Sequence, residues 1–164
     1  MTALVPPSTP EADHARNVVK ELVHVCRDGE HAFERAARAV DNPVMRAELI
    51  QYSVQRREFV AELQEALAAV GDRADDDMPA YSSDQGRWQV LERAAEAGDR
   101  RTLLHECENF DRSALDVYRN ALQARLPYAL DGVVHSHFYS LTRIQSRLQC
   151  LADLAGGGSP IDNA

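Results

Sequence analysis

The chain has 164 residues and a net charge of −8, from 26 acidic and 18 basic side chains, and this length suits a single domain. Hydrophobic residues make up 45% and aromatic residues 6%, which argues against both disorder along the whole chain and a β-sandwich or β-barrel. The acidic balance also makes nucleic acid a poor partner, because an acidic surface repels phosphates.

The first part of the chain predicts two long helices. Ser8 and Glu11 have the spacing of a capping box, so we expect a helix over 10–40. Asn42 is a good N-cap and a proline follows it, so we expect a second helix over 43–70. The short connection makes these two helices antiparallel neighbours.

The second part predicts one short helix and two long ones. Residues 72–83 are acidic and turn-rich, and a short amphipathic stretch follows over 84–97. Asp99 caps a helix expected over 100–125. A Leu-Pro break separates it from a last helix over 128–155, again an antiparallel neighbour.

The long predicted helices each carry an apolar stripe one face wide, which is the pattern of a four-helix bundle. The connection between the second and third long helices carries the short helix and is too long for a tight turn. We therefore expect an all-α, ferritin-like four-helix bundle over 10–155, with one long crossover. Residues 1–9 and 156–164 are expected to be flexible tails.

Three runs of sequence resemble a known family: CRDGEHAFERAARAVDNPVMRAELIQYSVQRREFVAELQ, ECENFDRSALDVYRNALQARLP and HSHFYSLTRIQSRLQCL. The family is an uncharacterised bacterial group of four-helix-bundle proteins in the ferritin-like superfamily, and the resemblance spans 16–153. It implies a ferritin-like fold and no particular reaction. The chain has Asp111 in place of Glu, His137 in place of Gln and Gln145 in place of His, so we carry over no site residue.

A few polar residues fall on or beside the apolar stripes. Arg56 lies on one stripe and His137 on another, while Asp111 and Gln145 border theirs. A buried guanidinium keeps its charge and needs a carboxylate, for which Asp111 is the first candidate and Glu106 the second. An ion pair that fixes helix register is the favoured interpretation, and a specialised polar site is the alternative.

Gly29 lies on the stripe of the first helix, where glycine costs about 1 kcal/mol relative to alanine. It would let a large side chain come close, with Tyr52, Phe59 and Phe138 as candidates. A break in the helix is the other interpretation.

No metal site is expected, because the inward faces do not supply the roughly six converging ligands of a carboxylate-bridged iron pair. His31 and Glu34 are expected on a solvated face. The cysteines are three, widely spaced and without a zinc pattern. Together with the absence of a signal-like N-terminus or of a long apolar run, they favour a cytoplasmic protein.

These observations predict a protein without a cofactor that is not an enzyme and acts as a homodimer or with a protein partner. The alternative is a metal-binding, di-iron oxidoreductase or an iron-handling protein, and a weaker one is an anion binder near Arg56 and His137. The association hypothesis depends on apolar residues outside the stripes, which could cover a dimer face or the crossover helix; they are Trp88, Leu104, Leu115, Leu122, Val133 and Leu154.

Overall fold

The computed structural model describes residues 9–71 and 85–156, which form five α-helices and no strand. None of these helices is long and apolar enough to cross a membrane. Most of both predicted tails lies outside the described residues, although Gly156 closes the last helix. The helices are α1 (Pro10–Ala39), α2 (Pro43–Ala69), α3 (Gln85–Ala97), α4 (Arg100–Leu122) and α5 (Tyr128–Gly156).

Side-chain caps fix where several helices begin. The Asn42 side chain accepts the backbone N–H groups of the first turn of α2, and Asp99 does the same for α4, as predicted. The first helix differs from the prediction, because its N-cap is Thr9, whose side chain accepts the N–H of Ala12. The proposed capping box was therefore wrong in its cap residue, and Ser8 lies outside the described residues.

The predicted helix boundaries agree with the structure to within a few residues. The largest difference is at the end of α4, which stops at Leu122 and not at 125. The N–H groups of Gln123 and Ala124 bond to carbonyls three residues back, so the chain tightens here before the break at Pro127.

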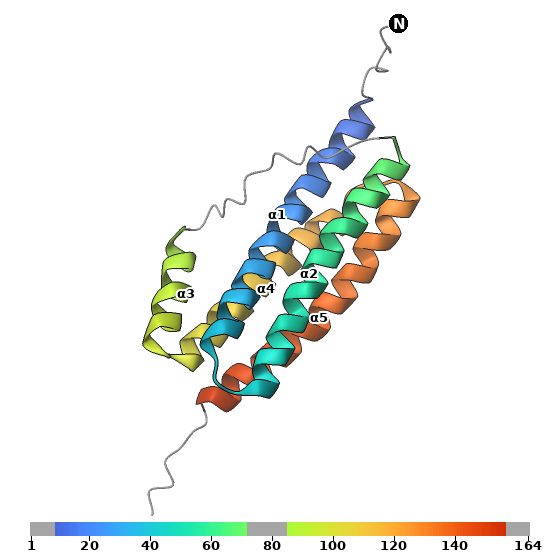
Figure 1. Cartoon of the computed structure of the whole chain (residues 1–164). Coiled ribbons are helices and arrows are strands. Elements are labelled where there is room, and N and C mark those ends of the chain that lie inside the picture. The colour runs from blue at the N-terminus through green and yellow to red at the C-terminus, as the bar shows by residue number, and fades with distance from the viewer. Residues whose placement is uncertain (1–8, 72–84, 157–164) are drawn as a thin grey trace, which may run out of the picture.

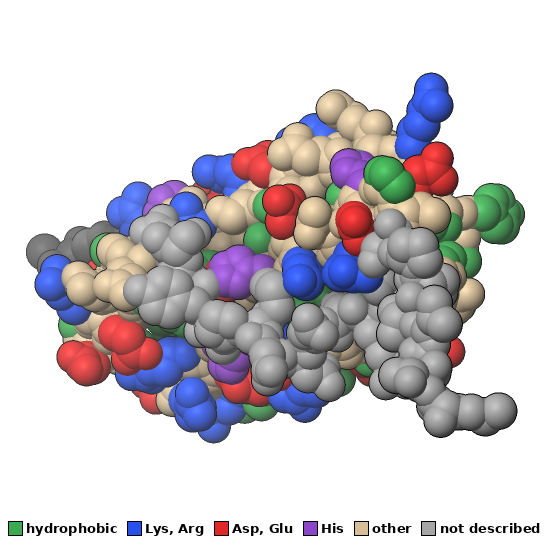
Figure 2. All heavy atoms as spheres, turned by 90° about the horizontal axis from the view of Figure 1, so that it is seen from above, with side chains coloured by type: hydrophobic (Ala, Val, Ile, Leu, Met, Phe, Trp, Pro, Cys, Tyr) green, Lys and Arg blue, Asp and Glu red, His purple; other side chains and the backbone are tan. Residues whose placement is uncertain are grey.

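The long helices α1, α2, α4 and α5 lie side by side (Figure 1). α1 is antiparallel to α2, and α4 is antiparallel to α5, whereas α2 and α4 run in the same direction (Figure 1). α3 lies outside this group, against α4 and α1. Seen from above, acidic and basic side chains are interspersed over the surface (Figure 2).

Two apolar clusters fill the interior, one toward each end of the long helices. The first includes Leu22 of α1, Leu63 of α2 and Leu130 of α5. The second includes Phe33 of α1 and Leu148 of α5, with α3 adding its own side chains. The gap between the two clusters is about one turn along α4 and α5 and wider along α1 and α2, and it contains Arg56 and Asp111.

α3 covers part of the second cluster. Its Leu91 is fully buried, and the ring centroids of Trp88 and Phe110 are 4.6 Å apart. Leu104 of α4 is also fully buried in this cluster. Trp88 and Leu104 therefore pack in the cluster that the crossover helix α3 covers, which is one of the two predicted interpretations, and they do not form a dimer face. Leu115 is likewise buried, in the first cluster.

We expect Leu91→Ala to lower the free energy of unfolding by about 2–5 kcal/mol, because the truncated side chain leaves a cavity under α3. Urea denaturation measures this change. Val90→Ala is the matched control on the exposed side of α3, and it should stay within about 0.5 kcal/mol of the wild type. Equal effects of the two substitutions would show that α3 is not docked through Leu91.

Candidate buried polar site

A buried ion pair joins α2 and α4 between the two apolar clusters. Arg56 is fully buried, and its Nη2 donates to Oδ1 of Asp111, which is 1% exposed. The rings of Phe33 and Phe59 lie 5.6 and 6.0 Å from the guanidinium carbon. Aromatic faces attract cations, so these rings also stabilise the charge of Arg56.

Gly29 makes room for this arginine. A Cβ atom built at position 29 would lie 3.3 Å from Nε of Arg56 and 3.5 Å from its Cγ. The close neighbour is thus the arginine, and not Tyr52, Phe59 or Phe138 as predicted. α1 continues through this glycine without a break.

The ion pair does not satisfy all of its own polar atoms. Nε and Nη1 of Arg56 and Oδ2 of Asp111 are buried and have no hydrogen-bond partner among the described residues. Burial raises the pKa of Asp111 to about 6, although the positive charge of Arg56 acts to lower it. At neutral pH the carboxylate therefore stays ionised opposite the guanidinium.

A second polar group lies next to the ion pair and is centred on His137 of α5. The ring of His137 is stacked on Phe59, with centroids 3.8 Å apart. Its Nδ1 is 2.9 Å from the hydroxyl of Tyr118, and its Nε2 is 2.8 Å from Oε2 of Glu62. The side chain of Glu62 is 53% exposed, so this group reaches the solvent on one side.

On the other side, the hydroxyl of Tyr118 is 3.3 Å from the thiol of Cys26. The series Cys26–Tyr118–His137–Glu62 thus joins α1, α4, α5 and α2 by three successive contacts. A carboxylate only accepts, so His137 donates from Nε2 to Glu62, and its Nδ1 accepts from Tyr118. The tyrosine oxygen then accepts from the Cys26 thiol.

The histidine, tyrosine and cysteine of this series favour their neutral forms. Burial lowers the pKa of His137, while Glu62 opposes this effect. Burial also raises the pKa values of Tyr118 and Cys26. A buried thiol with a raised pKa is a poor nucleophile. The arrangement links the four long helices through their side chains.

The structure divides the predicted polar residues into separate groups. Gln145 donates to Glu108 at 3.3 Å and does not contact the ion pair. Glu106 accepts from Asn109 in its own helix, so the second candidate partner for Arg56 was wrong. Sequence analysis missed Tyr118, Cys26 and Glu62. The sequence pattern indicates Tyr118 only weakly, because it lies one position beside the expected apolar stripe of its helix.

Among the described residues, no three His, Cys, Asp or Glu side chains are placed to hold a metal ion. Two Glu-x-x-His sequences, the motif of ferritin-like iron ligands, occur in α1 and were missed in the sequence. In both, the glutamate (Glu11, Glu21) is exposed, and His14 is exposed as well. Nε2 of His24 lies 3.6 Å from Oδ2 of Asp28 in the same helix, and both side chains are partly exposed. Neither motif supplies an inward ligand.

The model of a protein family described as a domain of unknown function (DUF2383) matches residues 14–124. The chain belongs to this family. The match to DUF2383 includes α2, α3 and α4 together with Gly29, Arg56 and Asp111, and it ends before α5. No curated protein matches the chain at a significant level. The resemblance seen in the sequence is thus confirmed as far as a family of unknown function.

We expect Arg56→Met to lower the free energy of unfolding by about 3–5 kcal/mol, because it leaves the carboxylate of Asp111 buried without a partner. Asp111→Asn should also lower the free energy of unfolding, because it leaves the guanidinium of Arg56 buried without an anionic partner. The double variant should lose clearly less than the sum of the single losses, since it strands no charge. Urea denaturation of the four proteins measures this coupling, and strict additivity would contradict the ion pair.

A pH titration followed by NMR of the His137 ring should give a pKa below the usual histidine value, because burial disfavours the imidazolium. Glu62→Gln should lower this pKa further, since it removes the carboxylate that favours the charged ring. Glu65→Gln, one turn further along α2, is the matched control and should change little. A rise of the pKa in the Glu62 variant would contradict the contact.

Proposed function

We propose that this protein is a non-catalytic member of the ferritin-like superfamily that acts by associating with a second copy or with another protein. The helix directions support the ferritin-like assignment. Two antiparallel pairs, α1 with α2 and α4 with α5, are joined by a long connection that carries α3. This is the single-crossover arrangement of ferritin-like bundles.

The buried guanidinium of Arg56 is the observation that carries the non-catalytic part of the proposal. It lies in the polar layer between the long helices, and its positive charge repels a metal cation there. The carboxylate of Asp111, which a metal would need as a ligand, is engaged by Arg56 instead. The adjacent series from Cys26 to Glu62 uses its polar atoms internally.

Exposed apolar side chains support the association part. Large apolar residues on α2 and α5 are open to solvent, and such residues gather at protein interfaces. The most exposed are Tyr128 at 96%, Val44 at 72%, Leu154 at 71% and Tyr139 at 67%. The cysteines are all free thiols, which supports a reducing, cytoplasmic setting. A bacterial origin rests on the resemblance alone.

The alternative is a di-iron oxidoreductase or iron-handling protein, for which the helix arrangement is the supporting feature. Iron analysis separates the two. After incubation with ferrous iron in air and gel filtration, we expect substoichiometric iron, because Arg56 occupies the layer where ligands would converge. His24→Ala controls for binding at the outer face of α1. A stoichiometric pair of irons bound in both proteins would overturn the proposal.

A further inference from the structure

α2 carries a second stripe, on the face that points away from the core. The residues of this stripe recur with spacings of three and four, which is the heptad pattern of a helix-pairing seam. All of them are exposed in the structure. We call this set the outer seam; it consists of Val44, Ala47, Gln51, Val54, Glu58, Ala61, Glu65 and Ala68.

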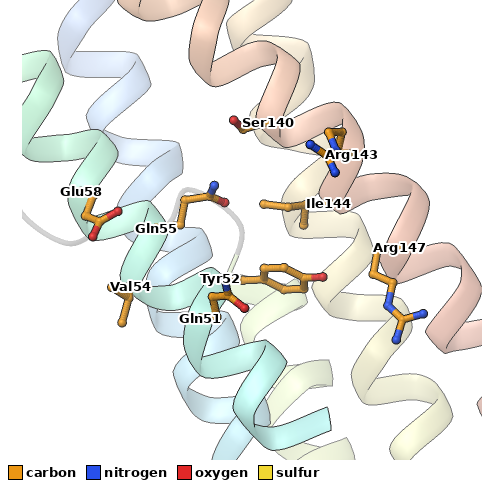
Figure 3. Close-up of a pocket in the computed structure, with 9 residues that line it drawn as sticks. All are labelled: Gln51, Tyr52, Val54, Gln55, Glu58, Ser140, Arg143, Ile144 and Arg147. Carbon is orange, nitrogen blue, oxygen red and sulfur yellow. The ribbon is translucent and has the colours of Figure 1, made fainter. Parts of the chain in front are cut away.

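The outer seam lies between two grooves. One, of about 600 Å³, runs between α2 and α5, and Figure 3 shows Tyr52 and Gln55 pointing across it toward α5. The other, of about 630 Å³, runs between α1 and α2. Val54 lines both grooves. A helix ridge with a groove on each side is the shape that another helix packs against.

Apolar side chains lie on the ridge itself. Val44 is 72% exposed, Ile50 is 48% exposed and Val54 is 41% exposed. The first half of α2 therefore carries large apolar side chains on its outer as well as its inner face, and such side chains are normally covered. The small side chains Ala47 and Ala61 would let a second helix approach closely.

Charge along this surface is divided between its two ends. Arg147 of α5 pairs with Glu48 at 2.6 Å, which sets α5 residues 143–147 beside the first half of α2. Arg143 lines the same groove and has no ion-pair partner among the described residues. The second half of the seam is acidic, with Glu58 and Glu65 likewise unpaired within the described chain.

A second copy of this chain fits that distribution. An antiparallel partner, related by a twofold axis near Val54, would place Val54 against itself and Ala47 against Ala61 of the other copy. This twofold axis is perpendicular to α2 and lies in the plane of the interface. It therefore places α5 of one copy opposite α5 of the other. Glu58 and Arg143 both line the α2–α5 groove, so Glu58 of one copy would lie near Arg143 of the partner.

We propose that two copies of this chain pair through α2 in antiparallel orientation, with Glu58 of each copy beside Arg143 of the other. This inference rests on the proposed function and names its partner and its surface. The two contacts are equivalent by symmetry, as in isologous dimers.

Sedimentation equilibrium of the full chain tests the pairing. The wild type should be a dimer. Glu58→Arg alone and Arg143→Glu alone should each weaken dimerisation, because each places like charges across the axis. The variant that carries both substitutions should regain the wild-type dimer, since the charges are exchanged and again opposite. Glu96→Arg, an exposed reversal on α3, is the control and should leave the dimer unchanged.

Val54→Arg should give a monomer, because it sets two like charges against each other at the axis. Circular dichroism reports whether this variant folds. If it does not fold, the variant that carries both Glu58→Arg and Arg143→Glu tests the interface instead. A monomeric wild type would overturn the dimer and with it the self-association part of the proposed function. A dimer unaffected by all of these substitutions would overturn this surface alone and leave self-association intact.

Discussion

The fixed charge of Arg56 is the constraint on which the interior depends. A guanidinium cannot lose its proton in a protein, so its burial requires a carboxylate from a neighbouring helix and space for a long side chain. Asp111 of α4 provides the carboxylate, and Gly29 of α1 provides the space. The apolar core is divided into two clusters on either side of this layer. Sliding α2 by one turn would separate the pair, which makes it a fixed point for helix register.

The series from Cys26 to Glu62 lies beside this layer, in the first apolar cluster, and its cysteine, tyrosine and histidine favour their neutral forms. Together the two sets connect α1, α2, α4 and α5 through side-chain contacts. The positive charge of Arg56 opposes a metal ion in this layer, so the proposed function is placed on the outer surface. The outer face of α2 has the opposite character, with exposed apolar residues and unpaired charges.

Much of the helical structure could be predicted from the sequence, because caps and prolines are local signals. The pairing of Arg56 with Asp111 followed from the requirement that a buried cation needs an anion. Glu62 could not be predicted, since it lies off the apolar stripe and reaches His137 only through the length of its side chain. The neighbour of Gly29 depended on how α1 and α2 pack, which periodicity does not determine. The role of Trp88 likewise depended on where α3 docks.

The most direct test of a metal-free, ion-paired interior is anomalous diffraction at the iron edge from crystals grown with ferrous iron. We expect no anomalous peak between the long helices, and we expect electron density that joins the guanidinium of Arg56 to the carboxylate of Asp111. A pair of strong peaks in that layer, with Asp111 turned away from Arg56 to bind them, would contradict this expectation.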